Sequence, residues 1–217
     1  MGELALHKIP GMIKKILLIL LLLILGIVGF YWYKFSHAGG GPSGPKQPPL
    51  VLKKHSEGFN KSIAVFMNAY FDMKNAFVEG DSTAVKAGCK KFIQLIDSIP
   101  VNELKNDTAS IFETVKANLT DIRMNAESLL KQTNITEMRQ DFRMVSEMLY
   151  PSFFRAINYE GEKMYWQNCP MAFGEGKEAN WISNTVDIVN PYLGKNHPEF
   201  KSGMLHCGEI KDTIQAQ

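Results

Sequence analysis

FNKSIAVFMNAYFDMKNAFVEG, residues 59–80, is the stretch of sequence that decides the fold. Large apolar residues recur in it at alternating spacings of four and three, which is the period of one face of an α-helix. They are Phe59, Ile63, Phe66, Tyr70, Met73 and Phe77. Gly80 follows the last of them and can end the helix in a left-handed conformation. The stretch therefore predicts a long helix that buries one face in a core.

Three further segments repeat this pattern toward the C-terminus. A second helix begins after a cap at Asp81 or Ser82 and ends before Pro100. A third helix is expected over 102–131, and a fourth opens with an Asn-x-x-Glu capping box at Asn134. Short connections between four such helices favour a mainly α fold, an antiparallel four-helix bundle.

The composition limits the classes of function. Of 217 residues, 45% are hydrophobic and 21% are charged, which excludes wholesale disorder and fibrous repeats. The 24 basic and 22 acidic residues leave a net charge of only +2, so the attraction to phosphate that drives nucleic-acid binding has no evident source. No acid, base or Ser/His/Asp constellation stands out on the helices. We therefore expect neither an enzyme nor a nucleic-acid partner.

Residues 16–33 read ILLILLLLILGIVGFYWY, eighteen residues without a charge, and predict one transmembrane helix. Lys14 and Lys15 precede this run and three aromatic residues close it, which favours a short cytoplasmic tail over 1–15 and a C-terminal domain outside the cytoplasm. A cleaved signal peptide is the alternative, because Ser36-His37-Ala38 offers small residues for a cleavage site.

A linker is expected between the apolar run and the helices. Residues 34–53 contain the sequence AGGGPSGPKQPPL, whose glycines give flexibility and whose prolines favour an extended chain. Such a segment cannot build a packed core. The folded domain is therefore expected to span 54–217.

Helical periodicity disappears in the tail, residues 164–210, where aromatic residues and two of the three cysteines lie between glycines. Short runs such as 181–188 suit strands or irregular loops, so we expect a small irregular or β-hairpin lobe. The remaining cysteine, Cys89, lies on the apolar stripe of the second helix. It is expected to be a small buried residue and not part of a site.

The tail also concentrates sulfur ligands. Cys169 and Met171 are two residues apart, so in an extended segment their side chains leave the same face, and a turn from Met204 to Cys207 can approach them across a hairpin. Thiolate and thioether sulfurs select Cu(I) and similar ions over Mg²⁺ or Ca²⁺. The imidazole of His206 could join them. These residues predict a soft-metal site.

Two alternatives for the same residues stay open. Outside the cytoplasm, Cys169 and Cys207 can form a disulfide that staples the glycine-rich lobe. Methionines can fill gaps in a core without binding any ion. The sequence alone does not choose between metal and disulfide.

Four blocks in the tail occur in a recognisable order: Cys169-Pro170-Met171-Ala172, Trp181-Ile182-Ser183, Asn190-Pro191-Tyr192-Leu193-Gly194 and Met204-Leu205-His206-Cys207-Gly208-Glu209. On these blocks the chain, over roughly Ser56 to Ile214, resembles the bacterial domain-of-unknown-function family 3347. The resemblance implies a helical domain that occurs on membrane-anchored or exported proteins. It also occurs at the C-terminal end of some periplasmic adaptors of copper/silver efflux systems.

The resemblance implies a role in binding a heavy metal. Cys169, Met171, Met204 and Cys207 match family motif positions, and His206 is carried only as a neighbour. The expected function is then that of a single-pass inner-membrane protein with a periplasmic domain that binds copper for sequestration, sensing or delivery to heavy-metal efflux components. The alternative is a structural or interaction domain that binds no metal and has a Cys169–Cys207 disulfide.

Overall fold

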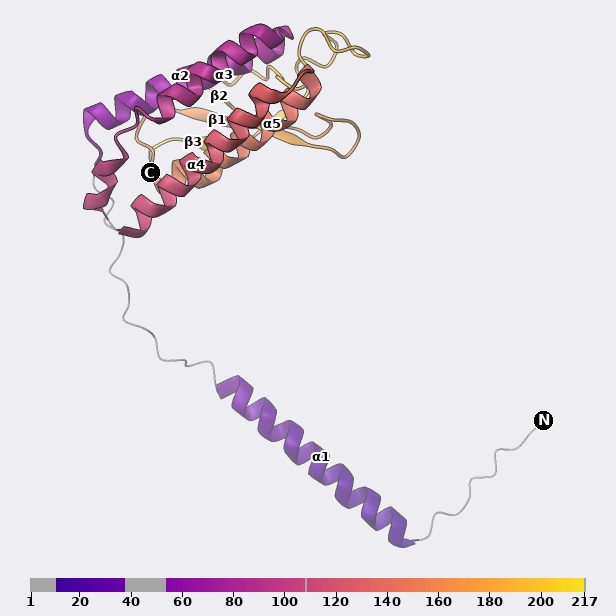
Figure 1. Ribbon diagram of the computed structural model, residues 1–217. Helices are drawn as coiled ribbons and strands as arrows, with labels where there is room; N and C mark the ends of the chain where they lie inside the picture. Colours follow the sequence, from indigo (N-terminus) through magenta and orange to yellow (C-terminus); the bar gives the residue numbers. More distant parts are fainter. Residues whose placement is uncertain (1–10, 38–53, 108, 217) are drawn as a thin grey trace, which may run out of the picture. The chain divides into compact units, whose positions relative to one another are not determined.

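The computed structural model describes residues 11–37, 54–107 and 109–216 (Figure 1). The chain divides into two compact units between Leu50 and Val51, of which the first contains helix α1, Gly11–His37. Residues 1–10 of the expected cytoplasmic tail and residues 38–53 of the expected linker lie outside the described residues. Within the described ranges, no helix meets the length and apolar character that a membrane span requires. The span expected at 16–33, which falls inside α1, is thus unsupported by this structure.

Helix α2, Glu57–Glu79, opens the second unit and confirms the first predicted helix. The Ser56 side chain accepts a hydrogen bond of 3.0 Å from the Phe59 amide and caps the first turn. Gly80 ends the helix with a φ of 74°, in the left-handed region that glycine tolerates. The predicted apolar stripe from Phe59 to Phe77 is buried throughout.

Two of the other predicted helix starts are also confirmed. Asp81 accepts from the amides of Thr83 and Ala84, both at 2.9 Å, and opens α3, Ser82–Ile96. Asn134 accepts from the Glu137 amide at 2.9 Å and opens α5, Ile135–Glu147. Short polar side chains at these positions satisfy amides that have no partner within the helix.

The expected third helix over 102–131 is wrong as one continuous element. The chain forms a 3₁₀ helix, η1, at Val101–Asn106 and then α4 at Ala109–Lys131. Between them Asp107 has φ −86° and ψ −85°, outside the helical region. Asn and Asp side chains compete with the helix for backbone hydrogen bonds, so Asn106-Asp107 is a sequence that favours such a break.

Helix α5 continues into an irregular segment before the tail. A π-helical turn, η2, spans Met148–Phe153, and a short α6 follows at Phe154–Ala156. Tyr150 has φ −131° and ψ 131° in the middle of this turn. The next residue is Pro151, which has no N–H to donate and disfavours a helical conformation in the residue before it.

The tail forms a three-stranded antiparallel sheet in the order β2-β1-β3. The strands are β1 at Met164–Cys169, β2 at Ala179–Ser183 and β3 at Glu209–Ile214. The expected β-hairpin corresponds to β1 and β2. The third strand was not predicted, and the run expected at 181–188 is a strand only as far as Ser183.

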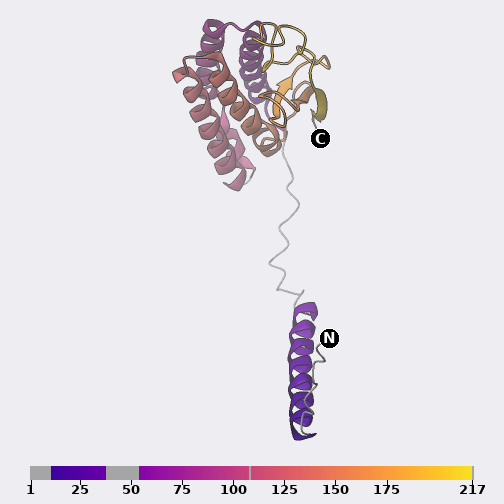
Figure 2. The same ribbon diagram turned by 90° about the vertical axis from the view of Figure 1, so that its right-hand side faces the viewer.

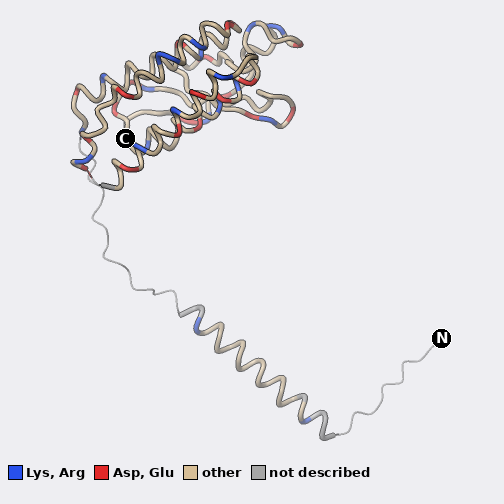
Figure 3. Tube along the Cα trace, in the orientation of Figure 1, with Lys and Arg blue, Asp and Glu red and all other residues tan. Residues whose placement is uncertain are grey.

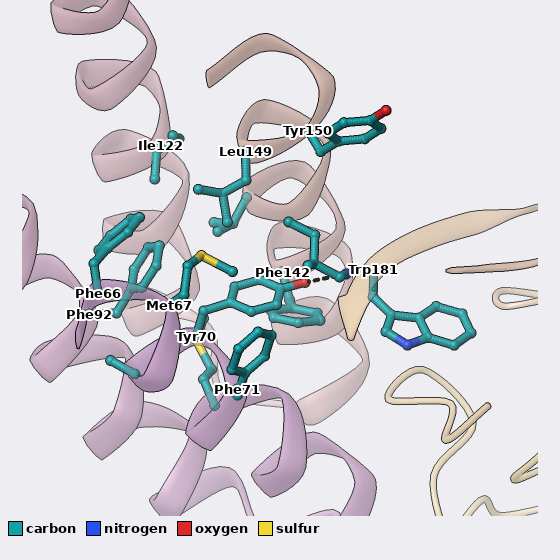
Figure 4. Close-up of a cluster of buried hydrophobic side chains, with 14 of the residues drawn as sticks. Phe66, Met67, Tyr70, Phe71, Phe92, Ile122, Phe142, Leu149, Tyr150 and Trp181 are labelled. Carbon is teal, nitrogen blue, oxygen red and sulfur yellow. Dashed lines mark hydrogen bonds between the residues drawn. The ribbon is translucent and has the colours of Figure 1, made fainter. Parts of the chain in front are cut away.

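The helices pack in chain order, α2 on α3, α3 on α4 and α4 on α5, and α5 also contacts β2. Figure 2 shows the sheet and the C-terminal loops on one side of these helices. Tyr70 joins the two parts, because its hydroxyl hydrogen-bonds Ser146 Oγ at 2.7 Å and accepts from the Ile182 amide at 3.1 Å. Its ring stacks on Phe142 with centroids 5.1 Å apart (Figure 4). The unit is therefore mainly helical, with a small antiparallel sheet fixed to its core.

Candidate functional site

The sheet brings two of the predicted ligands together. Cys169 is the fully buried last residue of the central strand β1. Strand β3 runs antiparallel to β1 with Glu209 opposite Asn168, so the turn that precedes β3 reaches the end of β1. Cys207 lies in that turn, and its Sγ is 2.7 Å from Sγ of Cys169. The two thiols are in direct contact, so they can act as one pair, as a disulfide, or, with the sulfur atoms moved apart, as two ligands of one ion.

A glycine makes this approach possible. Gly208 follows Cys207 with a φ of 148°, a conformation that other residues rarely adopt. A Cβ atom on Gly208 would lie 2.6 Å from the Asn168 carbonyl oxygen and 3.0 Å from the Trp181 ring. No larger residue fits between β1 and Trp181 at this position. Gly208 therefore allows the chain to carry Cys207 to Cys169.

Asn190 holds the Cys207 turn from the other side. Its side chain is fully buried, and Nδ2 donates to the Cys207 carbonyl oxygen at 2.8 Å. The backbone N–H of Asn190 donates to the Leu205 carbonyl oxygen at 2.9 Å. Its Oδ1 accepts from the amides of Tyr192 and Leu193 at 2.8 and 3.0 Å. The Asn-Pro-Tyr-Leu-Gly block, for which the sequence offered no role, thus positions the turn that bears Cys207.

The same block also completes the C-terminus of α2. The Lys195 amide donates to the Val78 carbonyl oxygen at 2.8 Å, and the Asn196 side chain donates to the Glu79 carbonyl oxygen at 2.8 Å. The last carbonyls of a helix have no hydrogen-bond partner within the helix, so these two bonds satisfy carbonyl oxygens that would otherwise lack a protein partner. The segment 190–196 therefore links the turn that carries Cys207 to the C-terminus of α2.

The Cys207 thiol is held in its protonated form. Burial, the hydrogen bond with Cys169 and the charge that Cys169 would carry together raise the pKa of Cys207 to about 12. A thiol must lose its proton to bind a metal or to attack a disulfide. Any ion at this pair therefore competes with protons at neutral pH.

Met171 lies outside the extended segment that was expected to align it with Cys169. Strand β1 ends at Cys169, Pro170 follows it, and Met171 begins a turn closed by a 3.2 Å bond from the Gly174 amide to the Met171 carbonyl oxygen. The side chain of Met171 lines a separate cavity of about 470 Å³. Proline at this point ends the alternation on which the expectation relied.

Met204 and His206 both precede Cys207 in the turn that carries it. Met204 is partly buried against the core, and its carbonyl oxygen accepts from the Cys207 amide at 3.0 Å. His206 is exposed, and its Nδ1 lies 2.7 Å from the Ile188 carbonyl oxygen. A carbonyl can only accept, so Nδ1 donates this bond, and Nε2 is the ring nitrogen left for another partner. The imidazole is therefore oriented with a ligand atom available.

The donor set fits a soft ion better than a hard one. Within the ranges that the structure describes, no three or more His, Cys, Asp or Glu side chains gather as a metal cluster. The structure brings together two thiols, which do not complete the four-ligand shell of structural zinc but suit Cu(I). The pair can also be oxidised to a disulfide.

Cys89 is a packing residue, as predicted. It is fully buried between α2, α3 and α4 and its Sγ donates to the Ala126 carbonyl oxygen at 3.2 Å. Burial and the nearby charge of Asp141 raise its pKa to about 12. A thiol in this state is inert, so Cys89 is no part of the candidate site.

Comparison with known proteins identifies a family for the helical part. Residues 66–156 match the family described as "Protein of unknown function (DUF3347)", which confirms the family that the tail motifs suggested. The match covers the helices and excludes the cysteine pair, so it assigns no ligand residue. Neither the curated proteins nor the solved structures gave a match.

Proposed function

We propose, for a chain whose segment 66–156 belongs to this family, that the C-terminal lobe binds one soft metal ion, copper as Cu(I), at Cys169 and Cys207. The observation that carries the proposal is the 2.7 Å separation of the two sulfur atoms, which come from residues 38 positions apart. Two thiolates at one point are a ligand set that hard ions do not prefer.

The surrounding residues have separate roles in this proposal. Cys169 and Cys207 each lose a proton and supply a thiolate. His206 Nε2 is a candidate third ligand, because Ile188 already accepts the proton on Nδ1. Met171 and Met204 stay in the proposal as thioether donors. To reach an ion at the two cysteines, the turns that carry these methionines would have to change conformation. The chain carries out no chemical reaction in this proposal, so its role is sequestration, sensing or delivery.

The proposed location is the inner membrane, with the second unit in the periplasm. The uncharged run 16–33 supports an anchor, and apolar side chains of α1 between Leu18 and Tyr33 are exposed, for example Leu18 at 61% and Trp32 at 77%. In Figure 3 the blue segments of α1 lie near its two ends, and the stretch between them contains no Lys, Arg, Asp or Glu. The proposed partners are the membrane and heavy-metal efflux components, with no nucleic acid. A reporter fused after Gln217 tests the orientation, because activity of a cytoplasmic reporter alone would contradict it.

A second candidate rests on the same distance. Cys169 and Cys207 can form a structural disulfide, which joins the end of β1 to the turn before β3 in a domain that binds no metal. Closing a loop of this length stabilises a domain by roughly 4 kcal/mol in the chain-entropy model. An interaction domain stapled in this way is the alternative function.

One experiment separates the two. The purified full-length chain is reduced, loaded with Cu(I) without oxygen and analysed for bound copper and free thiols, and the as-isolated chain is analysed in parallel. One copper per chain, lost in both Cys169→Ser and Cys207→Ser but kept in Cys89→Ala, supports the metal site. No copper in the reduced chain, together with a Cys169–Cys207 bridge in peptide maps of the isolated chain, supports the disulfide.

A further inference from the structure

A cavity of about 470 Å³, lined in part by Met171, contains neither Cys169 nor Cys207 in its lining. Its walls come from α5, from the β1–β2 connection at 171–175 and from the segment 192–200. Its size falls within the range of small-molecule sites. All three walls belong to the second unit, so the cavity is a feature of one folded body.

A buried cation lies in one wall. Arg139 is 6% exposed, and it donates through Nε to the Pro191 carbonyl oxygen at 2.9 Å and through Nη2 to the Phe77 carbonyl oxygen at 3.0 Å. Among the described residues, its Nη1 has no hydrogen-bond partner and no carboxylate forms an ion pair with it. Burial lowers the pKa of Arg139 to about 10, which leaves it charged at neutral pH. A buried guanidinium without an anion favours a carboxylate ligand.

Two carboxylates lie in the lining of the same cavity. Glu175 and Glu199 are both exposed, and the described residues form no ion pair with either. They would repel a simple anion and attract an ammonium group. The cavity therefore presents one buried positive charge and two exposed negative charges.

The remaining lining is apolar and aromatic. Phe173 packs on Tyr192 with ring centroids 5.3 Å apart, and Phe200 stacks on His197 at 4.9 Å. His197 Nδ1 accepts from the amides of Glu199 and Phe200 at 3.2 and 3.3 Å, which fixes the turn that carries both residues. The side chain of Met171 also lines this space. These groups suit an apolar or aromatic ligand body.

We propose that this cavity binds a free α-amino acid with an apolar side chain. Its carboxylate pairs with Arg139, its ammonium group with Glu175 and Glu199, and its side chain packs between Phe173 and Phe200. A zwitterion carries both a negative group that can pair with Arg139 and a positive group that can pair with the two glutamates. This inference does not depend on copper, since it uses neither Cys169 nor Cys207.

The test uses three probes of one shape. The full-length chain in lipid nanodiscs is titrated calorimetrically with L-phenylalanine, with 3-phenylpropanoate, which lacks the ammonium group, and with 2-phenylethylamine, which lacks the carboxylate. We expect L-phenylalanine to bind with a Kd of about 1 mM or below. Each of the other two should bind at least about tenfold more weakly, because each leaves one charge unanswered. Equal binding of all three, or no binding of L-phenylalanine, overturns the proposal.

Variants locate the site. The double variant Glu175→Gln and Glu199→Gln changes only exposed side chains and should weaken L-phenylalanine at least about tenfold while leaving 3-phenylpropanoate no weaker. Glu137→Gln, at an exposed position of α5 outside the cavity, is the matched control and should change neither. If the double variant binds L-phenylalanine as well as the control does, the assigned ammonium site is wrong. Phe200→Ala should weaken all three probes.

Discussion

Asn190 Nδ2 donates a 2.8 Å hydrogen bond to the backbone carbonyl of Cys207, and through it a fully buried amide fixes the position of a cysteine seventeen residues away. The same amide carries the turn at Tyr192 and Leu193 through its oxygen. The arrangement means that the geometry of the cysteine pair depends on a residue that has no donor atom for a soft metal.

Asn190→Ala should therefore destabilise the domain and loosen the pair. Removing the amide leaves the Cys207 carbonyl and two backbone amides without their partners, and we expect a loss of roughly 2 to 4 kcal/mol in the free energy of unfolding. Chemical denaturation of the full-length chain measures it. Asn196→Ala is the control, because its exposed side chain makes one bond, to the Glu79 carbonyl oxygen, and should cost less than about 1 kcal/mol. Equal losses in the two variants would contradict the role of Asn190.

The role of Gly208 can be tested against Gly174, a second glycine with a positive φ. Gly208→Ala combines a φ of 148° with a Cβ placed 2.6 Å from the Asn168 carbonyl oxygen, so it should cost about 3 kcal/mol or more. Gly174→Ala has a φ of 110° but nothing within 4 Å of its Cβ, so it should cost about 1 kcal/mol. Thermal unfolding of both variants gives the comparison. A loss at Gly208 no greater than at Gly174 would show that β1 and the Cys207 turn can separate without penalty.

The pH dependence of copper binding tests the state of the thiols. The pKa of Cys207 is raised to about 12, so Cu(I) must displace protons and its apparent affinity should rise with pH. We expect a gain of about tenfold per pH unit for each proton released between about pH 6 and 8. Competition with a chromophoric Cu(I) chelator, corrected for the chelator's own titration, measures this gain. An affinity that does not change with pH would mean that no thiol proton is displaced and that the ligands are the thioethers.

Lys74 predicts a pH dependence of stability that is separate from the cysteines. Its side chain is 4% exposed, forms no ion pair among the described residues, and has a pKa lowered by burial from 10.5 to about 8. Between these two pH values Lys74 holds a proton in the unfolded chain that it lacks in the folded chain, so the contribution of Lys74 to the free energy of unfolding should rise with pH across this window. The gain is on the order of 3 kcal/mol.

Lys74→Met should abolish that rise, because methionine fills the space without titrating. Denaturation at several pH values from about 7 to 11 compares the variant with the unmodified chain. Lys90→Met, at an exposed position of α3, controls for the loss of a lysine. If both variants follow the same curve as the unmodified chain, the Lys74 ammonium group reaches water in the folded state.

The helices were predictable because their signals are local. The stripe from Phe59 to Phe77 and the caps at Asp81 and Asn134 all depend on residues within four positions of one another. The break at Asp107 was missed because the apolar period continues across it. Strand β3 was missed for a different reason, since Glu209–Ile214 is an exposed, charged edge strand with little apolar alternation.

The candidate site was predictable only in part. The order of the motifs placed Cys169 and Cys207 in one site, and the structure brings these two together. It does not carry Met171 along the same strand, because the chain turns at Pro170. The role of Asn190 depends on partners fifteen to seventeen positions away, Leu205 and Cys207, and no local pattern in the sequence predicts such contacts.

The hydrogen bonds from residues 195–196 to the end of α2 determine how far a truncated fragment of this domain must extend toward the C-terminus. The family segment ends at Ala156, yet the carbonyls of Val78 and Glu79 are satisfied by residues nearly forty positions beyond it, and Tyr70 depends on the amide of Ile182. A fragment that stops at Ala156 would expose these groups together with the aromatic face that β2 covers. We therefore expect a fragment that ends at Ala156 not to fold on its own, and a fragment for expression should extend from about residue 54 to 216.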